Sequence, residues 1–196
     1  MSDNSPNSRW LKTPAWLAEQ LGKPDIVVVD GSFYLPVHKR DPKAEYLAGH
    51  IPGAVFFDID AVCDHSTDLP HMLAGPADFG KAAGKLGISD KDTIVVYDGA
   101  GLSSSPRVWW NFRIMGAKNV FMLDGGLPAW TAEGHPTEAG EVKRQPATFN
   151  AEMNTRAVAM HDDIQMAIND GSVQIVDARP AGRFAGRDPE PRPGLR

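Results

Sequence analysis

The chain has 196 residues, enough for one large domain or for one domain and part of another. Its composition is 42% hydrophobic and 23% charged, an ordinary balance for a soluble globular protein. The formal net charge of −5 argues against a nucleic-acid-binding surface and against attachment to an acidic membrane, and no apolar run approaches the roughly 20 residues of a membrane span.

The N-terminus and the cysteine content bear on the cellular setting. Residues 1–9 are polar and are expected to be disordered, and they contain no apolar signal core that would direct export. The single cysteine, Cys63, rules out an internal disulfide framework. It fits a reducing, cytoplasmic setting.

Helix and strand patterns alternate along residues 10–137. Short helices are predicted over 13–21, 77–86, 106–115 and 127–132. Strands are predicted over 26–29, 55–57, 94–97 and 120–123, with polar loops at 36–45 and 58–76. The strand at 26–29 is continuously apolar, not alternating, as in a sheet that is covered on both faces. The pattern therefore predicts an α/β fold.

The stretch 93–110 has the form of a strand, a tight loop and a helix N-terminus. Asp98-Gly99-Ala100-Gly101 ends the apolar run, and Pro106 can occupy a first helical turn. Such a turn forms a cradle of backbone N–H groups that favours an anion or a thiolate. Asp98 stands where a nucleophile would be expected, and we predict that it is not one.

The opening pattern returns after a segment of lower hydrophobicity, residues 138–154, which we interpret as a linker. A helix at 162–168 and a strand at 173–177 repeat the first helix and strand, and Asp177 follows Asp30 by 147 residues. Only 19 residues remain after Asp177. Residues 155–196 are therefore expected to be the truncated start of a second copy, which packs only partially or leans on a partner fragment, with a loose natural tail as the alternative.

Several motifs together resemble the tandem-domain sulfurtransferases of the rhodanese family. They are Tyr46-Leu47-Ala48-Gly49-His50-Ile51-Pro52-Gly53-Ala54, Ser105-Pro106-Arg107-Val108-Trp109-Trp110, Leu123-Asp124-Gly125-Gly126-Leu127-Pro128-Ala129-Trp130, Asp177-Ala178-Arg179, Gly182-Arg183-Phe184 and Pro189-Glu190-Pro191-Arg192-Pro193-Gly194. Phe57-Asp58-Ile59-Asp60 and His71-Met72-Leu73 resemble the 3-mercaptopyruvate sulfurtransferase branch in particular. The resemblance implies a rhodanese-like, doubly covered parallel sheet, with a complete non-catalytic domain at 10–137 and the start of the catalytic domain at 155–196.

The resemblance also implies an activity. Sulfur would pass from 3-mercaptopyruvate to a cysteine thiolate, and from the persulfide to a thiol acceptor such as thioredoxin or to cyanide. That cysteine would lie near position 245, beyond residue 196, in the C-terminal part of the protein, which would be a partner of this chain if the two are separate. Cys63 is not its equivalent and is interpreted as a packed or incidental thiol. The 196-residue chain alone is therefore expected to be inactive.

By the same resemblance, Asp60 and His71 are catalytic residues that form half of a Ser–His–Asp proton relay. Arg183 and Arg192 are substrate-binding residues that hold the carboxylate in the cleft between the domains, because a planar guanidinium binds carboxylate through two hydrogen bonds. From the residues alone, His71 and Asp60 could equally cap a loop. Both arginines could equally be exposed structural side chains.

No cofactor is predicted, and neither is a metal site, because the histidines lack ligand spacing and His50 more simply orders its Gly-His-Ile-Pro-Gly turn. A dinucleotide site at Gly99-x-Gly101 is disfavoured, because Ser104 replaces the third glycine. A phosphatase is disfavoured because Asp98 and Ser104 occupy the positions of its Cys and Arg. A thiosulfate sulfurtransferase and a non-catalytic interaction module remain as alternatives.

Overall fold

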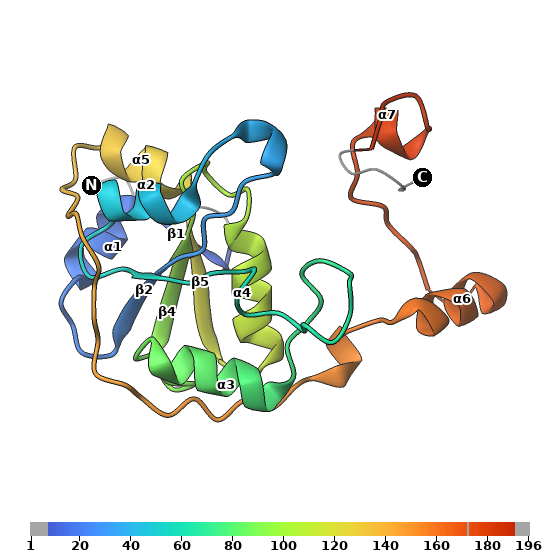
Figure 1. The fold of residues 1–196 in the computed structure, drawn as a ribbon, viewed down its shortest axis with the longest axis horizontal. Helices are drawn as coiled ribbons and strands as arrows, with labels where there is room; N and C mark the ends of the chain where they lie inside the picture. The colour runs from blue at the N-terminus through green and yellow to red at the C-terminus, as the bar shows by residue number, and fades with distance from the viewer. Residues whose placement is uncertain (1–7, 172, 191–196) are drawn as a thin grey trace. The chain divides into compact units, whose positions relative to one another are not determined.

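The computed structural model describes residues 8–171 and 173–190. Most of the stretch that we expect to be disordered, residues 1–9, lies outside this part. The chain divides into two compact units after Thr155, and the first contains a five-stranded parallel sheet (Figure 1). Its strands are β1 (Leu11–Lys12), β2 (Ile26–Asp30), β3 (Val55–Phe56), β4 (Thr93–Tyr97) and β5 (Asn119–Leu123).

Helices connect these strands. They are α1 (Pro14–Gln20), α2 (Pro42–Ala48), α3 (Pro76–Lys85), α4 (Ser105–Ile114) and α5 (Gly126–Ala132), with a short 3-10 helix at Pro36–His38. None of the helices in the described part combines the length and the apolar character that a bilayer crossing demands. All four helices and all four strands predicted for residues 10–137 are present in the predicted order. β1 and α2 are additional elements that were not predicted.

The sheet has the order β1-β5-β4-β2-β3, and every pair of neighbours is parallel. β4 lies at the centre, where Val95 is paired with Val28 of β2 and with Phe121 of β5. Because all strands run the same way, their carboxyl ends lie along one edge of the sheet. The loops after β2 and β4 are therefore neighbours at that edge.

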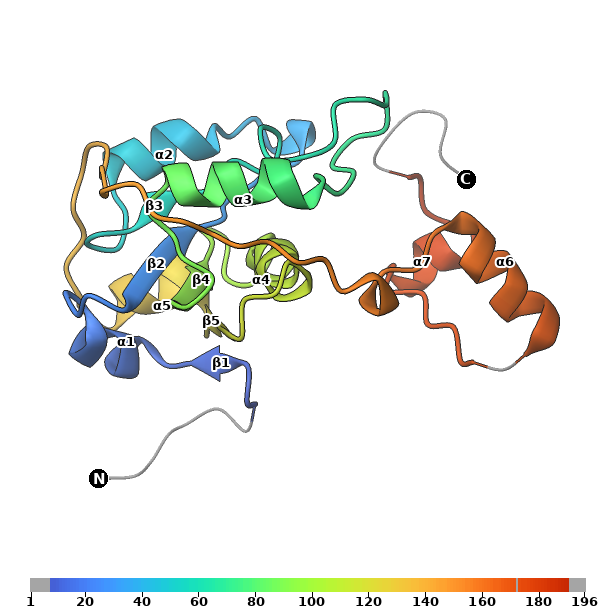
Figure 2. The ribbon, with the colours of Figure 1, turned by 90° about the horizontal axis from the view of Figure 1, so that it is seen from below.

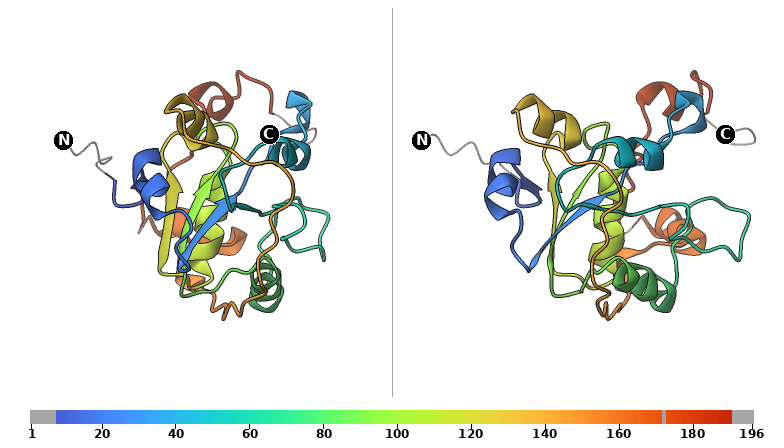
Figure 3. Two further views of the ribbon diagram at one scale, coloured as in Figure 1. Left: turned by 90° about the vertical axis from the view of Figure 1, so that its left-hand side faces the viewer. Right: turned by 60° about the vertical axis from the view of Figure 1, so that its left-hand side comes forward.

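Alternate strand residues divide between the two faces of the sheet, as the pleat requires. On one face, Val28 and Val95 pack in a core with Leu17 of α1 and Trp130 of α5. Figures 2 and 3 show α1 and α5 on one side of the sheet and α3 and α4 on the other. The predicted double cover is therefore confirmed.

The opposite face carries a cluster of phenylalanines. Phe79 of α3 and Phe112 of α4 have ring centroids 5.3 Å apart, and both rings contact Phe57, which directly follows β3. Phe149, from the segment after α5, closes the cluster and is buried. This packing fixes α4, whose N-terminus faces the edge at which the loops meet.

Sequence reasoning misses β1 and α2. β1 is only two residues long, too short for a periodic pattern. α2 lies partly in the predicted loop at 36–45, although its start carries a recognisable signal. The Asp41 side chain accepts the N–H of Ala44 at 3.0 Å, and Pro42 occupies the first turn.

Residues 138–154 contain no helix or strand, as a linker would, but they are attached to the first unit along their length. Glu138 and His50 exchange two backbone hydrogen bonds of 2.9 Å. Further on, the N–H of Ala147 donates to Gly84, and the N–H of Asn154 donates to Ile114. The segment therefore belongs to the core of the first unit, with Phe149 as its anchor.

The second unit contains α6 (His161–Asp170) and α7 (Ala181–Phe184), and α6 confirms the helix predicted at 162–168. The strand predicted over Val173–Asp177 is wrong, because the described residues there have no strand pairing. Val173 and Val176 are 58% and 78% exposed. A strand needs a neighbour for its N–H and C=O groups, and the described part of this unit offers none.

Candidate functional site

The loop after β4 is built around the carboxylate of Asp98. Its Oδ2 accepts the backbone N–H groups of Ser103, Ser104 and Ser105 at 2.7, 2.9 and 2.8 Å. Its Oδ1 accepts the N–H of Ala100 at 2.9 Å. The side chain is fully buried. Asp98 therefore fills the anion cradle that the strand, the loop and the helix N-terminus form.

Burial and hydrogen bonding act in opposite directions on the pKa of Asp98. Burial raises this pKa because an apolar environment disfavours the charged form, whereas hydrogen bonds from Ser105, Ala100 and Ser104 stabilise the carboxylate. The hydrogen bonds outweigh burial, so the pKa lies below the ordinary value. Asp98 is therefore an anion at neutral pH, and it occupies the place that a thiolate or another anion would need.

Two serines join this loop to the loop after β2. Ser104 Oγ donates to the carbonyl of Gly31 at 2.8 Å and accepts the N–H of Phe33 at 3.0 Å. Ser32 Oγ accepts the N–H of Gly99 at 2.9 Å. The two loops at the edge of the sheet are thus one hydrogen-bonded structure with Asp98 at its centre.

A second, more open group lies on the long segment between β3 and α3. His71 Nε2 is 3.1 Å from Asp60 Oδ1, and the side chains are 20% and 65% exposed. A local turn places Asp60, because Asp58 Oδ1 accepts the N–H groups of Asp60 and Ala61 at 2.9 and 3.1 Å. The structure brings together the two residues predicted to form the relay, and their catalytic role stays a prediction.

Two residues that sequence reasoning did not select contact His71. The Phe33 ring meets the imidazole edge-on, with ring centroids 4.7 Å apart. Arg107 Nη2 donates to the backbone oxygen of His71 at 2.5 Å. A signal for Arg107 exists in the sequence, because a cation in the first turn of a helix opposes the helix dipole and calls for a reason. No comparable signal marks Phe33.

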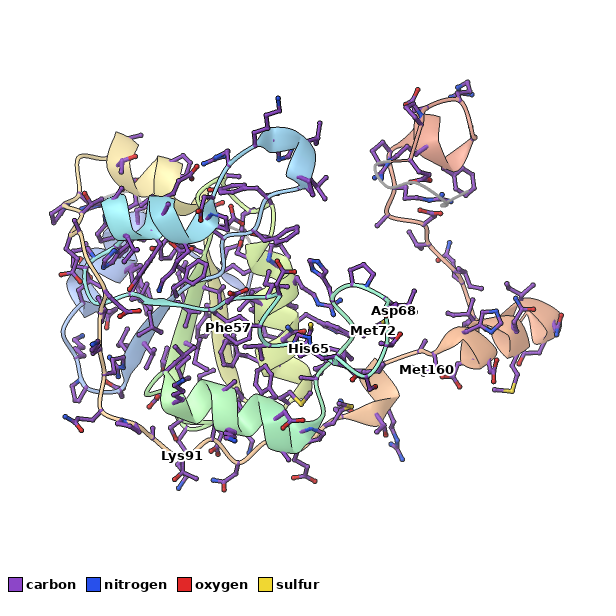
Figure 4. The ribbon with its side chains drawn as sticks, viewed as in Figure 1. Phe57, His65, Asp68, Met72, Lys91 and Met160 are labelled. Carbon is purple, nitrogen blue, oxygen red and sulfur yellow. The ribbon has the colours of Figure 1, made fainter. Side chains whose placement is uncertain are left out.

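Cys63 lies on the same segment as Asp60 and His71. Its Sγ donates to the backbone oxygen of Asp60 at 3.1 Å, and the nearer nitrogen of His65 is 3.8 Å away. A pocket of about 490 Å³ separates residues 61–66 from the start of α3. Figure 4 shows His65 on this projecting segment. The hydrogen-bonding contacts of Cys63 are local to its own loop, which fits an incidental thiol.

His50 is fully buried, and its contacts stabilise the turn in which it lies. Its Nδ1 is 2.8 Å from the oxygen of Tyr46, and its Nε2 is 3.1 Å from Glu138 Oε1. The imidazole also stacks on the Tyr46 ring, with centroids 4.2 Å apart. These contacts agree with the prediction that His50 orders the Gly-His-Ile-Pro-Gly turn. Among the described residues, no three His, Cys, Asp or Glu side chains are grouped closely enough to hold a metal ion.

The two predicted substrate-binding arginines belong to the second unit. Arg183, in α7, has its Nη1 3.4 Å from Glu190 Oε2. The same glutamate is bound more closely by Arg179, at 2.7 Å, and Arg179 also pairs with Asp177 at 2.8 Å. Arg192 lies outside the described residues. Arg183 is therefore only weakly paired within its own unit.

A sequence model of the rhodanese-like domain matches residues 13–133. The chain is 42% identical over 191 residues to the 3-mercaptopyruvate sulfurtransferase of Escherichia coli K12, covering 97% of this chain and 68% of the relative. It is 40% identical over 202 residues to the mitochondrial thiosulfate/3-mercaptopyruvate sulfurtransferase 1 of Arabidopsis thaliana, covering 92% of this chain and 53% of the relative. The crystal structure of SseA from Escherichia coli matches with a TM-score of 0.86 at 42% identity, over 90% of this chain and 68% of that one.

Proposed function

The chain belongs to the rhodanese family, and from that premise we propose that it supplies the non-catalytic domain of a tandem 3-mercaptopyruvate sulfurtransferase. Residues 10–137 form that domain, the connecting segment 138–154 packs against it, and 155–196 begin a second, catalytic domain. One observation carries the proposal: the carboxylate of Asp98 closes the anion cradle, whereas the His71–Asp60 pair stays open.

The proposed reaction moves one sulfur atom without an oxidant or a cofactor. A cysteine thiolate of the second domain attacks the sulfur of 3-mercaptopyruvate. The carbon–sulfur bond breaks, and its electron pair goes to the methylene carbon as the enolate of pyruvate. The proton of the substrate thiol is transferred to that carbon, which leaves pyruvate and a persulfide on the cysteine. A thiol such as thioredoxin, or cyanide, then removes the sulfur.

His71 and Asp60 suit the proton transfer in this scheme. Asp60 Oδ1 lies 3.1 Å from Nε2 of His71, so the carboxylate favours the tautomer with its proton on Nε2. Nδ1 is then the basic nitrogen that accepts and returns the substrate proton. General acid–base help of this kind contributes roughly 10²–10⁴ in rate.

Arg183 and Arg192 suit the carboxylate of the substrate. Two parallel N–H groups of a guanidinium match the two oxygens of a carboxylate. Arg183 is available for this because Arg179 holds Glu190 more closely than Arg183 does. Arg192 is assigned the same role by its place in the family motif.

Thiosulfate is the second candidate donor, because the Arabidopsis relative is a thiosulfate/3-mercaptopyruvate sulfurtransferase. The cysteine of the second domain would again accept the sulfur, but thiosulfate carries no carboxylate and its transfer needs no carbon protonation, so Arg183, Arg192 and the relay would matter less. A non-catalytic interaction module is the third possibility, and a sulfurtransferase assay separates it from both enzyme functions.

The test compares the 196-residue chain with the tandem protein, by which we mean this chain continued by a complete second rhodanese domain. We expect the tandem protein to release pyruvate from 3-mercaptopyruvate and the chain alone to release none, because Asp98 cannot carry a persulfide. Pyruvate release by the chain alone would refute the proposal. Sulfite release from thiosulfate, with no reaction of 3-mercaptopyruvate, would favour the second donor.

A further inference from the structure

We propose that Arg107 is a positioning residue that holds His71 in place for proton transfer. Helix α4 would thereby support the His71–Asp60 relay, even though the loop that precedes this helix has Asp98 in place of a nucleophile. The inference rests on the proposed function, because it assigns a supporting layer to the same relay.

The contact itself is short and specific. Arg107 Nη2 donates to the backbone oxygen of His71 at 2.5 Å, across 36 positions of sequence. The guanidinium also lies over the ring of Trp110, 5.1 Å from its centroid, one helical turn further on. Trp110 thus limits the directions that the Arg107 side chain can take.

Arg107 occupies its place despite several costs to stability. Its cation lies in the first turn of α4, where the helix dipole favours anions. Its Nε is buried with no hydrogen-bond partner in the described structure. Burial lowers the pKa of the guanidinium, with the Cys63 side chain acting in the opposite direction. Such costs are concentrated at functional sites, where a buried unpaired group needs an explanation.

His71 has a backbone conformation that calls for such support. Its φ is 59°, in the left-handed region that non-glycine residues seldom adopt. Strained backbone of this kind persists only where its surroundings hold it. The hydrogen bond from Arg107 ends on the carbonyl of this very residue, so it acts directly on the strained backbone.

Three groups thus hold His71 from different elements. Asp60 contacts the imidazole Nε2, Phe33 packs edge-on against the ring, and Arg107 holds the carbonyl. Phe33 is in turn bonded to Ser104, the residue that precedes α4. Of the three supports, Arg107 lies in the helix that follows the closed loop, and Phe33 is tied to that loop by its hydrogen bond to Ser104. The closed loop thus has a supporting function without a nucleophile.

The helix also supplies a matched control. Arg113 lies on α4 and its Nη1 donates to the backbone oxygen of Lys118 at 2.7 Å. Its guanidinium lies over the ring of Trp10, 4.8 Å from the centroid. Arg113 therefore makes the same two kinds of contact as Arg107, but neither involves the relay.

The first experiment is a double-mutant cycle in the tandem protein with 3-mercaptopyruvate as donor. We expect Arg107→Met to lower kcat roughly 10- to 100-fold with KM nearly unchanged, and Arg107→Lys to recover part of that loss. Arg113→Met should leave both constants near wild type. In a His71→Ala background, Arg107→Met should cause no further loss, because Arg107 acts only through His71.

An equal loss from Arg107→Met in both backgrounds would overturn the inference, as would an unchanged kcat in the protein that retains His71. Wild-type kcat for His71→Ala would instead overturn the proposed relay, and the catalytic part of this inference with it. The positioning is then decided by nuclear magnetic resonance on the 196-residue chain. We expect Arg107→Met, and not Arg113→Met, to move the His71 imidazole signals, which sense the Phe33 ring. Unmoved signals would refute the contact.

Discussion

The loop around Asp98 and the segment that carries His71 differ in how far their polar side chains are exposed to solvent. Asp98 is fully buried and accepts four backbone hydrogen bonds. The His71–Asp60 pair has one side-chain contact of 3.1 Å, and Asp60 is 65% exposed. In the first region both carboxylate oxygens are held by backbone N–H groups of the protein itself, whereas the second region keeps a polar pair accessible.

This difference separates what stabilises the fold from what could perform chemistry. A fully buried carboxylate that is held by four backbone N–H groups is out of reach of a substrate, but its loss leaves those N–H groups unpaired. A partly exposed imidazole contributes little to stability and can still exchange protons. Changes to the closed region should therefore alter stability, and changes to the open groups should alter activity.

The same contrast between occupied and available groups exists in the second unit, where Arg179 is closely paired with Glu190 and Arg183 only weakly. We expect Arg183→Ala in the tandem protein to reduce kcat/KM for 3-mercaptopyruvate roughly 30- to 1000-fold, since a lost charge-assisted carboxylate contact costs about 2–4 kcal/mol. Arg183→Lys should recover only part of this, because an ammonium is not a planar fork. Steady-state kinetics decide the point, and near-wild-type values for Arg183→Ala would remove the substrate-binding role.

Asp98→Asn should sharpen the comparison through pH. The pKa of Asp98 is lowered in the folded state, so its carboxylate stabilises the fold above the unfolded pKa of about 4 and loses that effect as pH falls through the lower, folded pKa. We expect the variant to lose about 2–3 kcal/mol in the free energy of unfolding at pH 7.

The difference from wild type should shrink as the solution becomes more acidic. Urea unfolding of both proteins at neutral and acidic pH measures this difference. Asp30 also makes stability depend on pH, and comparison with the wild type, which contains the same Asp30, corrects for that contribution. Burial raises the pKa of Asp30, so its own contribution changes with pH in the opposite sense. A difference that stays constant between pH 7 and pH 3 would show that the charge of Asp98 is not what the cradle binds.

Cys63→Ser should have the smallest effect. Its thiol makes only a weak contact with the Asp60 carbonyl, which a hydroxyl can also make. We expect kcat for 3-mercaptopyruvate to stay within about twofold of wild type, a change near the limit of what surface substitutions cause. A tenfold loss in the well-folded tandem protein would give Cys63 a part in the reaction.

The sequence predicts the fold of residues 10–137 well because its signals there are local and repeated. Continuous apolar runs such as 26–29 indicate buried strands, and Pro and Gly residues mark the ends of the helices. The strand predicted at 173–177 fails for the opposite reason. A strand is not a local structure, and its apolar residues do not pair without a neighbour in the same unit.

Different parts of the candidate site could be predicted from different kinds of sequence signal, and some could not be predicted at all. The cradle around Asp98 follows from strand, loop and Pro106 alone, because every part of it is contiguous. The pairing of His71 with Asp60 came from the family resemblance, since nothing in the spacing of 11 residues requires contact. The cation in the first turn of α4 marks Arg107 as unusual, but neither Arg107 nor Phe33 could be assigned to His71 from the sequence, because these contacts span 36 and 38 positions and arise only from tertiary packing.

The central claim is tested most directly by comparing two single variants of the tandem protein, His71→Ala and Asp98→Ala. For each variant, both kcat and the free energy of unfolding in urea are measured. We expect His71→Ala to lower kcat about 10²–10⁴-fold while the free energy of unfolding changes little. Asp98→Ala should lower that free energy by about 2–3 kcal/mol while kcat of the folded protein stays within a few-fold of wild type. A thousandfold loss of kcat in folded Asp98→Ala, with normal turnover in His71→Ala, would contradict the account.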